Sequence, residues 1–139
     1  MTKLAVYYSF AGKAEEALEF YSDVFGGTVK SKMRYSEGPA EFSKDPVMAN
    51  WLMHGSAKLT DNMDIGVSDA LPEYAQINIG NQIEVMVETD TEAEADRIFA
   101  RLAEGGKVIM PMEVQFWGDY YGSLVDKYGN PWSLIKGTL

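Results

Sequence analysis

The chain has 139 residues, of which 46% are hydrophobic and 12% aromatic, a balance typical of a soluble globular protein of one domain. Its formal net charge of −9 and the scattered distribution of its 12 Lys and Arg residues argue against nucleic acid or an anionic membrane surface as a partner. No cysteine is present, and no stretch reaches the roughly 20 apolar residues of a membrane span, so neither thiol chemistry nor membrane insertion is expected. Since residues 1–10 also lack the apolar core of a signal peptide, we expect a cytoplasmic protein.

The first half of the sequence predicts a strand, a helix and three further strands. LAVYYSF, residues 4–10, is rich in the β-branched and aromatic residues that strands favour. Residues 14–25 carry apolar side chains with the spacing of an amphipathic helix, and Gly26-Gly27 predicts its end. A loop is expected around residues 35–50, which contain Gly38 and two prolines. The remaining strand-like runs of this half are residues 28–35, 48–59 and 63–68.

The second half repeats this order after a connection over residues 69–81. A strand is predicted at 82–88, QIEVMVE, and a helix at 92–104, which Gly105-Gly106 ends. Short strand-like runs follow at residues 107–112, 121–126 and 132–136.

The two halves are an internal repeat. Their helix and Gly-Gly segments align without gaps at an offset of 79 residues, so that Phe20 meets Phe99 and Val29 meets Val108. We therefore predict an α+β fold of two βαβββ modules, about residues 1–70 and 80–139 of a single domain 1–139. Its mixed sheet should be cupped, with the helices on the convex face and a ligand-sized hollow on the concave one. Exposed sheet edges also favour a homodimer.

Four segments carry a resemblance to a known family. They are AEEALEFYSDVFGG after a strand that ends SFAG, VMANWLMHGSAKL with DIGVSD, EAEADRIFARLAEGGKVIMPM, and FWGDYYGSLVDKYGNPWSL. In this order, and over nearly the whole chain, they resemble the vicinal oxygen chelate superfamily of glyoxalases, bleomycin-resistance proteins and ring-cleaving dioxygenases. The match is closer to its PhnB-like branch.

The resemblance implies four strand positions for the ligands of a divalent metal ion. Metal-dependent members place His or Glu there, whereas this chain has Ala5 or Val6, Gly66 or Ser68, Gln82 and Ser133. Neutral oxygens such as those of Gln82 and Ser133 would hold a divalent cation weakly. We therefore predict no metal and no other cofactor. Alternation places Glu84 and Glu88 on the same face as Gln82, which leaves an unusual carboxylate site as an alternative.

The remaining candidates suit an organic ligand. His54, the only histidine, could serve as a donor or base in a pocket. Tyr7 and Tyr8 must point to opposite sheet faces, and the family's pattern favours Tyr7 in the cup and Tyr8 under the helix. Large flat rings suit stacking, although any of them could simply pack the core. The predicted ligand-binding residues are Tyr7, Trp51, His54, Gln82, Trp117, Tyr121 and Ser133.

These observations favour a metal-free protein that binds a small organic molecule in the sheet cup, as a glyoxalase/bleomycin-resistance type of protein would. Whether it has catalytic activity stays open. One alternative is a divalent-metal-dependent lyase, isomerase or dioxygenase of the same superfamily. The other is a structural or interaction protein whose cup is filled with side chains.

Overall fold

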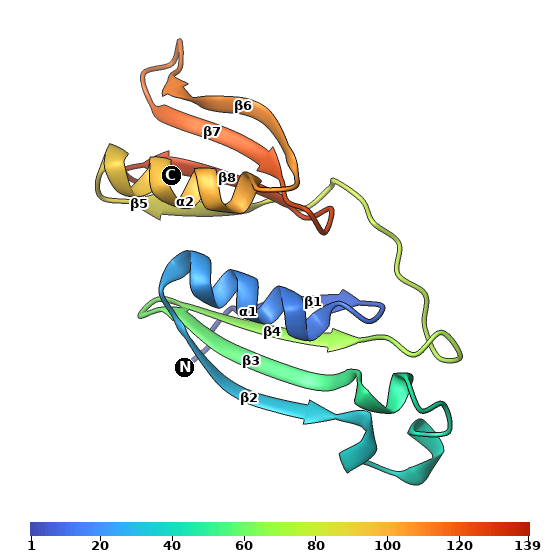
Figure 1. The fold of residues 1–139 in the computed structure, drawn as a ribbon. Helices are drawn as coiled ribbons and strands as arrows, with labels where there is room; N and C mark the ends of the chain where they lie inside the picture. Colours follow the sequence, from blue (N-terminus) through green and yellow to red (C-terminus); the bar gives the residue numbers. More distant parts are fainter. The chain divides into compact units, whose positions relative to one another are not determined.

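Each half of the chain folds into one four-stranded sheet with one helix (Figure 1). The computed structural model describes all 139 residues, and they form two compact units, Met1–Asn78 and Ile79–Leu139. The α+β fold with two βαβββ modules is confirmed. The boundary lies within the connection predicted at residues 69–81. That the two modules make up a single domain stays a prediction.

The first module has the strand order β1-β4-β3-β2, in which β1 and β4 run parallel and the other pairs antiparallel. Three 3₁₀ turns, at Tyr35–Glu37, Ala40–Phe42 and Met48–Asn50, follow β2. Its main elements are β1 (Val6–Phe10), α1 (Ala14–Phe25), β2 (Thr28–Arg34), β3 (Leu52–Thr60) and β4 (Met63–Asp69).

The second module repeats this arrangement with the order β5-β8-β7-β6 and a parallel β5–β8 pair. The side chain of Thr91 caps the helix by accepting a hydrogen bond from the Glu94 amide, 3.1 Å away. Its elements are β5 (Val85–Thr89), α2 (Glu92–Ala103), β6 (Lys107–Val114), β7 (Tyr120–Val125) and β8 (Pro131–Lys136).

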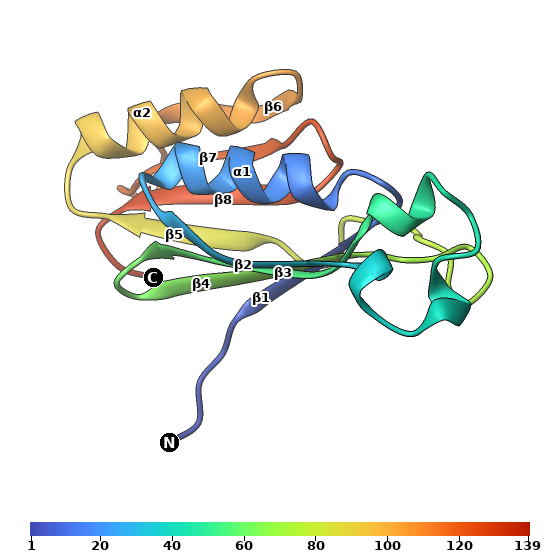
Figure 2. The same ribbon diagram turned by 60° about the horizontal axis from the view of Figure 1, so that its bottom comes forward.

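Each helix lies along one face of its own sheet (Figure 2). The apolar stripe predicted for α1 is buried, from Ala14 to Val24, and the same holds for Ala95 to Leu102 in α2. Tyr8 packs on this side of the first sheet, because its ring lies 5.7 Å from the ring of the buried Tyr21. The opposite face of the first sheet is therefore the one that carries Tyr7.

A Gly-Gly pair follows each helix, directly after α1 and one residue later after α2, whose C-cap is Glu104. The first glycine of each pair has a left-handed backbone, with φ of 68° at Gly26 and 74° at Gly105. The second approaches a strand end so closely that a Cβ atom would lie 2.3 Å from the Lys58 carbonyl oxygen at Gly27, or 2.2 Å from that of Val125 at Gly106. The repeat in the sequence thus reflects two different requirements for glycine at adjacent positions.

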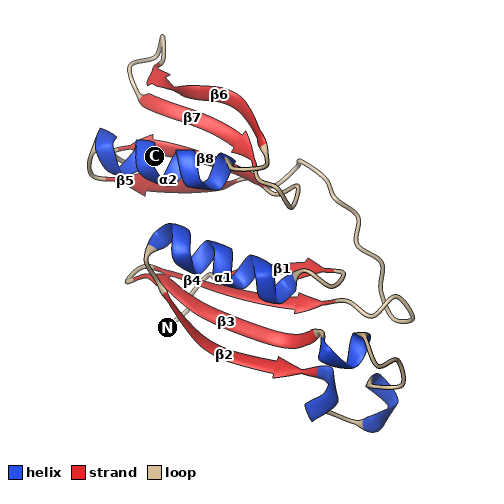
Figure 3. Cartoon of the chain, in the orientation of Figure 1, coloured by secondary structure: helices blue, strands red, loops and turns tan.

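Three strands begin later than the sequence pattern predicts, β1 by two residues and β3 and β5 by more (Figure 3). Residues 48–50 form a 3₁₀ turn, so β3 starts at Leu52. β5 starts at Val85, which leaves Gln82 and Glu84 outside the strand. The alternation that would align Gln82, Glu84 and Glu88 on one face therefore does not apply, and the expected strand at 82–88 was too long by three residues at its start.

Buried carboxylates hold the turns of both modules. Asp69 accepts backbone hydrogen bonds from Gly12 (2.7 Å), Ala14 (3.0 Å) and Leu52 (3.0 Å), so it joins the start of α1 to the start of β3. Asp126 binds the indole Nε1 of the fully buried Trp132 at 2.8 Å and two amides of its own turn. The D-x-x-G-x-x-W motif near the C-terminus is therefore a structural turn.

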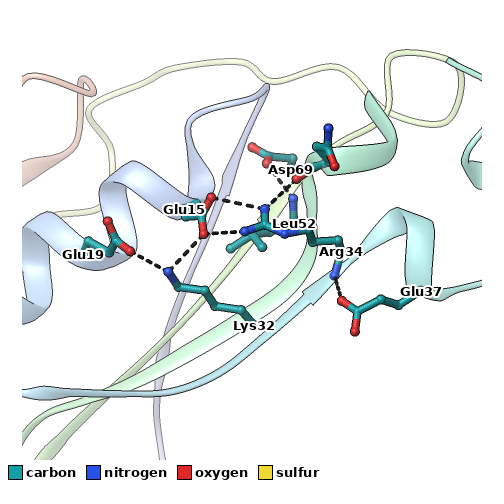
Figure 4. Close-up of polar contacts among 8 residues, drawn as sticks. Glu15, Glu19, Lys32, Arg34, Glu37, Leu52 and Asp69 are labelled. Atoms are coloured by element: carbon teal, nitrogen blue, oxygen red, sulfur yellow. Dashed lines mark hydrogen bonds and ion pairs between the residues drawn. The ribbon is translucent and has the colours of Figure 1, made fainter. Parts of the chain in front are cut away.

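Ion pairs tie α1 to the edge strand β2 (Figure 4). Arg34 donates two hydrogen bonds to Glu15, of 2.8 and 3.1 Å, and a third to the carbonyl of Asn50. Lys32 bridges Glu15 and Glu19. The hydrogen bonds from Arg34 and then from Lys32 hold the pKa of the Glu15 carboxyl below its usual range.

Candidate functional site

A row of residues crosses the first sheet on the face away from α1. Strand pairing places Tyr7 beside Gly66, Gly66 beside Ser56, and Ser56 beside Ser31. The two serine hydroxyls lie 2.7 Å apart. Except for Tyr7, this row consists of glycine and serine, whose short side chains leave the sheet surface uncovered. Tyr7 is the aromatic residue at one end of the row.

Tyr7 and His54 form the most specific contact on this face. The Tyr7 hydroxyl lies 3.1 Å from Nδ1 of His54, and the two rings are stacked with centroids 5.8 Å apart. Tyr7 is 53% exposed and His54 is exposed as well. The pair is thus accessible to a molecule from solvent and combines a flat ring with hydrogen-bonding groups.

Gly66 determines how the Tyr7 ring lies. A Cβ atom at position 66 would be only 2.5 Å from Cδ2 of Tyr7, so the ring rests on the sheet where Gly66 has no side chain. The family resemblance identified Gly66 or Ser68 only as the position of a potential metal ligand. The sequence alone does not show that this glycine makes room for the Tyr7 ring, because the contact follows from the pairing of β1 with β4, in which Tyr7 and Gly66 are direct partners.

The second module has the same row with different side chains. Met86 pairs with Ser133, Ser133 with Ser123, and Ser123 with Met110. Tyr121 precedes Ser123 by two residues, as His54 precedes Ser56, so it occupies the place of His54. Ser133 is fully buried and its hydroxyl has no hydrogen-bond partner.

Aromatic residues gather at the turn between β6 and β7. Trp117 is 48% exposed and contacts the rings of Phe116 (4.9 Å) and Tyr121 (5.8 Å). The turn is closed by a hydrogen bond from the Gln115 amide to the Asp119 carbonyl, and Gly118 has φ of 104°. The predicted residues Trp117 and Tyr121 are thus brought together.

Two other predicted residues lie elsewhere. Trp51 packs against the turn that leads into α1, where a Cβ atom on Gly12 would be 3.0 Å from its indole. Gln82 is exposed and precedes β5.

The positions that the resemblance equates with metal ligands do not form a donor set for a divalent ion. Val6 is aliphatic, Gly66 lies beneath the Tyr7 ring, and Ser133 offers one neutral hydroxyl. No group of three or more His, Asp or Glu side chains anywhere in the chain is placed to hold a metal ion. Divalent cations in such sites require carboxylate or imidazole ligands, so these residues do not fit one.

Comparison with known proteins gives a consistent result. The family model of the Glyoxalase/Bleomycin resistance protein/Dioxygenase superfamily matches residues 3–134. Protein YjdN of Escherichia coli (strain K12) is 27% identical over 139 residues, with 94% of this chain and 92% of YjdN covered. Neither helix has the length and apolar character that crossing a membrane would require.

Two solved structures are similar to the chain in both fold and sequence. Protein PA1353 from Pseudomonas aeruginosa has a TM-score of 0.84 at 27% identity, with 99% of this chain and 98% of that chain covered. The PhnB protein from Bacillus cereus has a TM-score of 0.80 at 28% identity, with 98% and 100% covered. The similarity therefore extends over the whole length of both modules.

Proposed function

Because this chain belongs to the glyoxalase/bleomycin resistance protein/dioxygenase superfamily, in its PhnB-like branch, we propose that it binds a small organic molecule without a metal ion. The observation that carries the proposal is the Tyr7–His54 pair on the sheet face away from α1. Trp117, Tyr121 and Ser133 are the corresponding candidates in the second module. Trp51 packs on Gly12 and is not part of this proposal, whereas the exposed Gln82 of the second module stays a candidate.

The chemistry of the pair indicates the kind of ligand. When the Tyr7 hydroxyl donates to Nδ1 of His54, the neutral imidazole carries its proton on Nε2, and that N–H is free to donate to a ligand. The exposed ring of Tyr7 offers a flat surface for stacking. We therefore infer a flat organic molecule that carries a hydrogen-bond acceptor such as a carbonyl or carboxylate.

The metal-free part of the proposal rests on the donor set. A binding or sequestering protein needs apolar surface and a few polar anchors, whereas Lewis-acid catalysis needs ligands that these positions lack. Metal analysis after dialysis tests this point against the metal-dependent alternative. Stoichiometric nickel, zinc, iron or manganese in the purified protein would overturn it.

Replacing Gly66 by alanine should weaken ligand binding about tenfold, because its Cβ would displace the Tyr7 ring while His54 is left unchanged. The ligand is first found by tryptophan fluorescence and melting temperature in a screen of flat aromatic acids and ketones, and its Kd is then measured by calorimetry. His54→Ala should weaken the same ligand by a similar factor.

Trp51→Phe is the matched control for this series, because it removes an indole that packs on Gly12 instead of the Tyr7 face. We expect its affinity to equal that of the unaltered protein. If Gly66→Ala and His54→Ala bind as tightly as the unaltered protein, the ligand does not lie on this face.

We also propose that the protein is a homodimer that covers the edge strand β6. This strand and the following turn expose apolar side chains, including Val114 (65% exposed) and Phe116 (98% exposed). Light scattering should give twice the chain mass of 15.5 kDa, and Val114→Lys should shift the equilibrium toward single chains. A single-chain mass for the unaltered protein at about 100 μM would contradict the proposal.

A further inference from the structure

A hollow of about 280 Å³ lies in the first module, beside the 3₁₀ turns that follow β2. None of its residues belongs to the Tyr7 face, and no predicted site residue lines it. Its lining residues are Glu41, Phe42, Lys44, Asp45, Met48, Leu71, Pro72 and Glu73.

The walls of the hollow are mostly apolar, and an aromatic cluster supports one of them. The ring of Phe42 meets Tyr74 edge to face at 5.5 Å and lies 6.1 Å from Tyr35. Tyr35 is itself fixed, since its hydroxyl donates to the carbonyl of Asp69 at 2.6 Å. The Phe42 wall therefore contacts one side chain that is hydrogen-bonded to the end of β4, that of Tyr35.

The rim of the hollow carries three carboxylates and one ammonium group. The carboxylates of Glu41 and Glu73 make no hydrogen bond or ion pair. Oδ1 of Asp45 accepts hydrogen bonds from the backbone amides of Val47 and Met48. Burial raises the pKa of the Tyr74 hydroxyl, and the negative charges of Glu73 and Glu41 raise it further. Both carboxylates therefore act on the aromatic cluster beside the hollow.

We propose that this hollow binds a small organic cation. Its apolar part would contact Phe42, Met48 and Leu71, and its positive charge would lie among the carboxylates of Glu41, Asp45 and Glu73. Cations are attracted both to carboxylates and to aromatic rings, and partial exclusion of water strengthens both attractions. This binding site is independent of the function proposed for the Tyr7 face.

A metal ion is the less suitable occupant. Calcium and magnesium need several oxygen ligands at about 2.0–2.6 Å from one point. The three carboxylates of the rim do not form a group that could hold a metal ion. A bulky cation with a diffuse charge, such as an alkylated ammonium group, suits a lining that combines apolar side chains with carboxylates.

Five of the eight lining residues lie in a segment that is present only in the first module. The chain from Tyr35 to Trp51 connects β2 to β3, whereas only residues 115–119 connect the corresponding strands β6 and β7. Long connections in compact domains frequently carry function. The hollow is thus an addition to the repeated fold.

Choline is the test ligand for the proposal. The control ligand is 3,3-dimethylbutan-1-ol, which has the same shape as choline but no charge. Titration of the full chain followed by NMR should show that choline binds about tenfold more tightly than the alcohol and shifts the signals of Phe42 and Tyr74. The double variant Glu41→Gln/Glu73→Gln should weaken choline binding about tenfold. Equal affinity for the two probes, or no binding of choline at about 50 mM, would overturn the proposal.

Two control variants separate this site from other effects. Asp61→Asn/Glu104→Gln removes the same number of charges at exposed positions outside the hollow, and choline should bind to it within about twofold of the unaltered protein. An equal loss in both double variants would overturn the proposal. His54→Ala should leave choline binding unchanged, so failure of the Tyr7 face as a ligand site would not affect this result.

Discussion

Replacing Asp69 by alanine should lower the free energy of unfolding by about 3–5 kcal/mol, the largest single effect we expect in the first module. Its carboxylate accepts three backbone hydrogen bonds from two separate segments, and it is only 2% exposed. Without it, the amides of Gly12, Ala14 and Leu52 would lose their acceptor. A buried donor without a partner costs about 1–3 kcal/mol.

Asp69→Asn is the matched control for this prediction. The amide oxygen of asparagine can still accept from Gly12 and Ala14, as Oδ1 of Asp69 does, but its NH₂ group would face the Leu52 amide. We expect a loss of about 2 kcal/mol. Urea denaturation followed by circular dichroism measures both variants, and an Asp69→Ala protein as stable as the unaltered one would show that these amides find other acceptors.

The second large effect is expected at Gly27. Its alanine variant would place Cβ 2.3 Å from the carbonyl oxygen of Lys58 and 2.7 Å from Cα of Leu59. Because both atoms belong to the backbone of β3, only a shift of the strand or of the helix end could relieve the contact. We expect a loss of about 2–4 kcal/mol in the free energy of unfolding, measured by the same denaturation.

The neighbouring Gly26 is the control, because its backbone is left-handed but no atom lies close to where its Cβ would be. A Cβ at Gly26 would meet nothing within 4 Å, so Gly26→Ala costs only the left-handed backbone strain of about 1–2 kcal/mol. The second module offers a repetition of the test at Gly106, whose Cβ would lie 2.2 Å from the Val125 carbonyl oxygen. If Gly26→Ala destabilised more than Gly27→Ala, the close approach to β3 would not be the cause.

The elements that rest on local patterns were predictable from the sequence. The helices at Ala14–Phe25 and Glu92–Ala103 follow from apolar periodicity and the Gly-Gly ends, and the repeat indicated the two modules. Strand starts were less predictable. Residues 48–50 have the composition of a strand but form a 3₁₀ turn, whose end at Trp51 is hydrogen-bonded to Met48.

Contacts between distant segments could be predicted only in part. Strand alternation separates Tyr7 from Tyr8, and the ring contact of Tyr8 with Tyr21 shows which of them lies under the helix. The pairing of Tyr7 with His54 depends on the register of three strands, because β4 lies between β1 and β3. Trp51 was predicted from its residue type alone, and its packing on Gly12 had no signal in the sequence.

The two buried carboxylates differ in the length of chain that they close. Asp126 binds partners 2, 4 and 6 residues away, so its turn can form before the rest of the second module. Asp69 binds Gly12 and Ala14 across 57 and 55 residues. The entropy lost on closing a loop grows with its length, and contacts of high sequence separation slow folding. The two carboxylates stand at different places in the repeat, Asp69 at the end of β4 and Asp126 between β7 and β8, so the first contact is long-range and the second local.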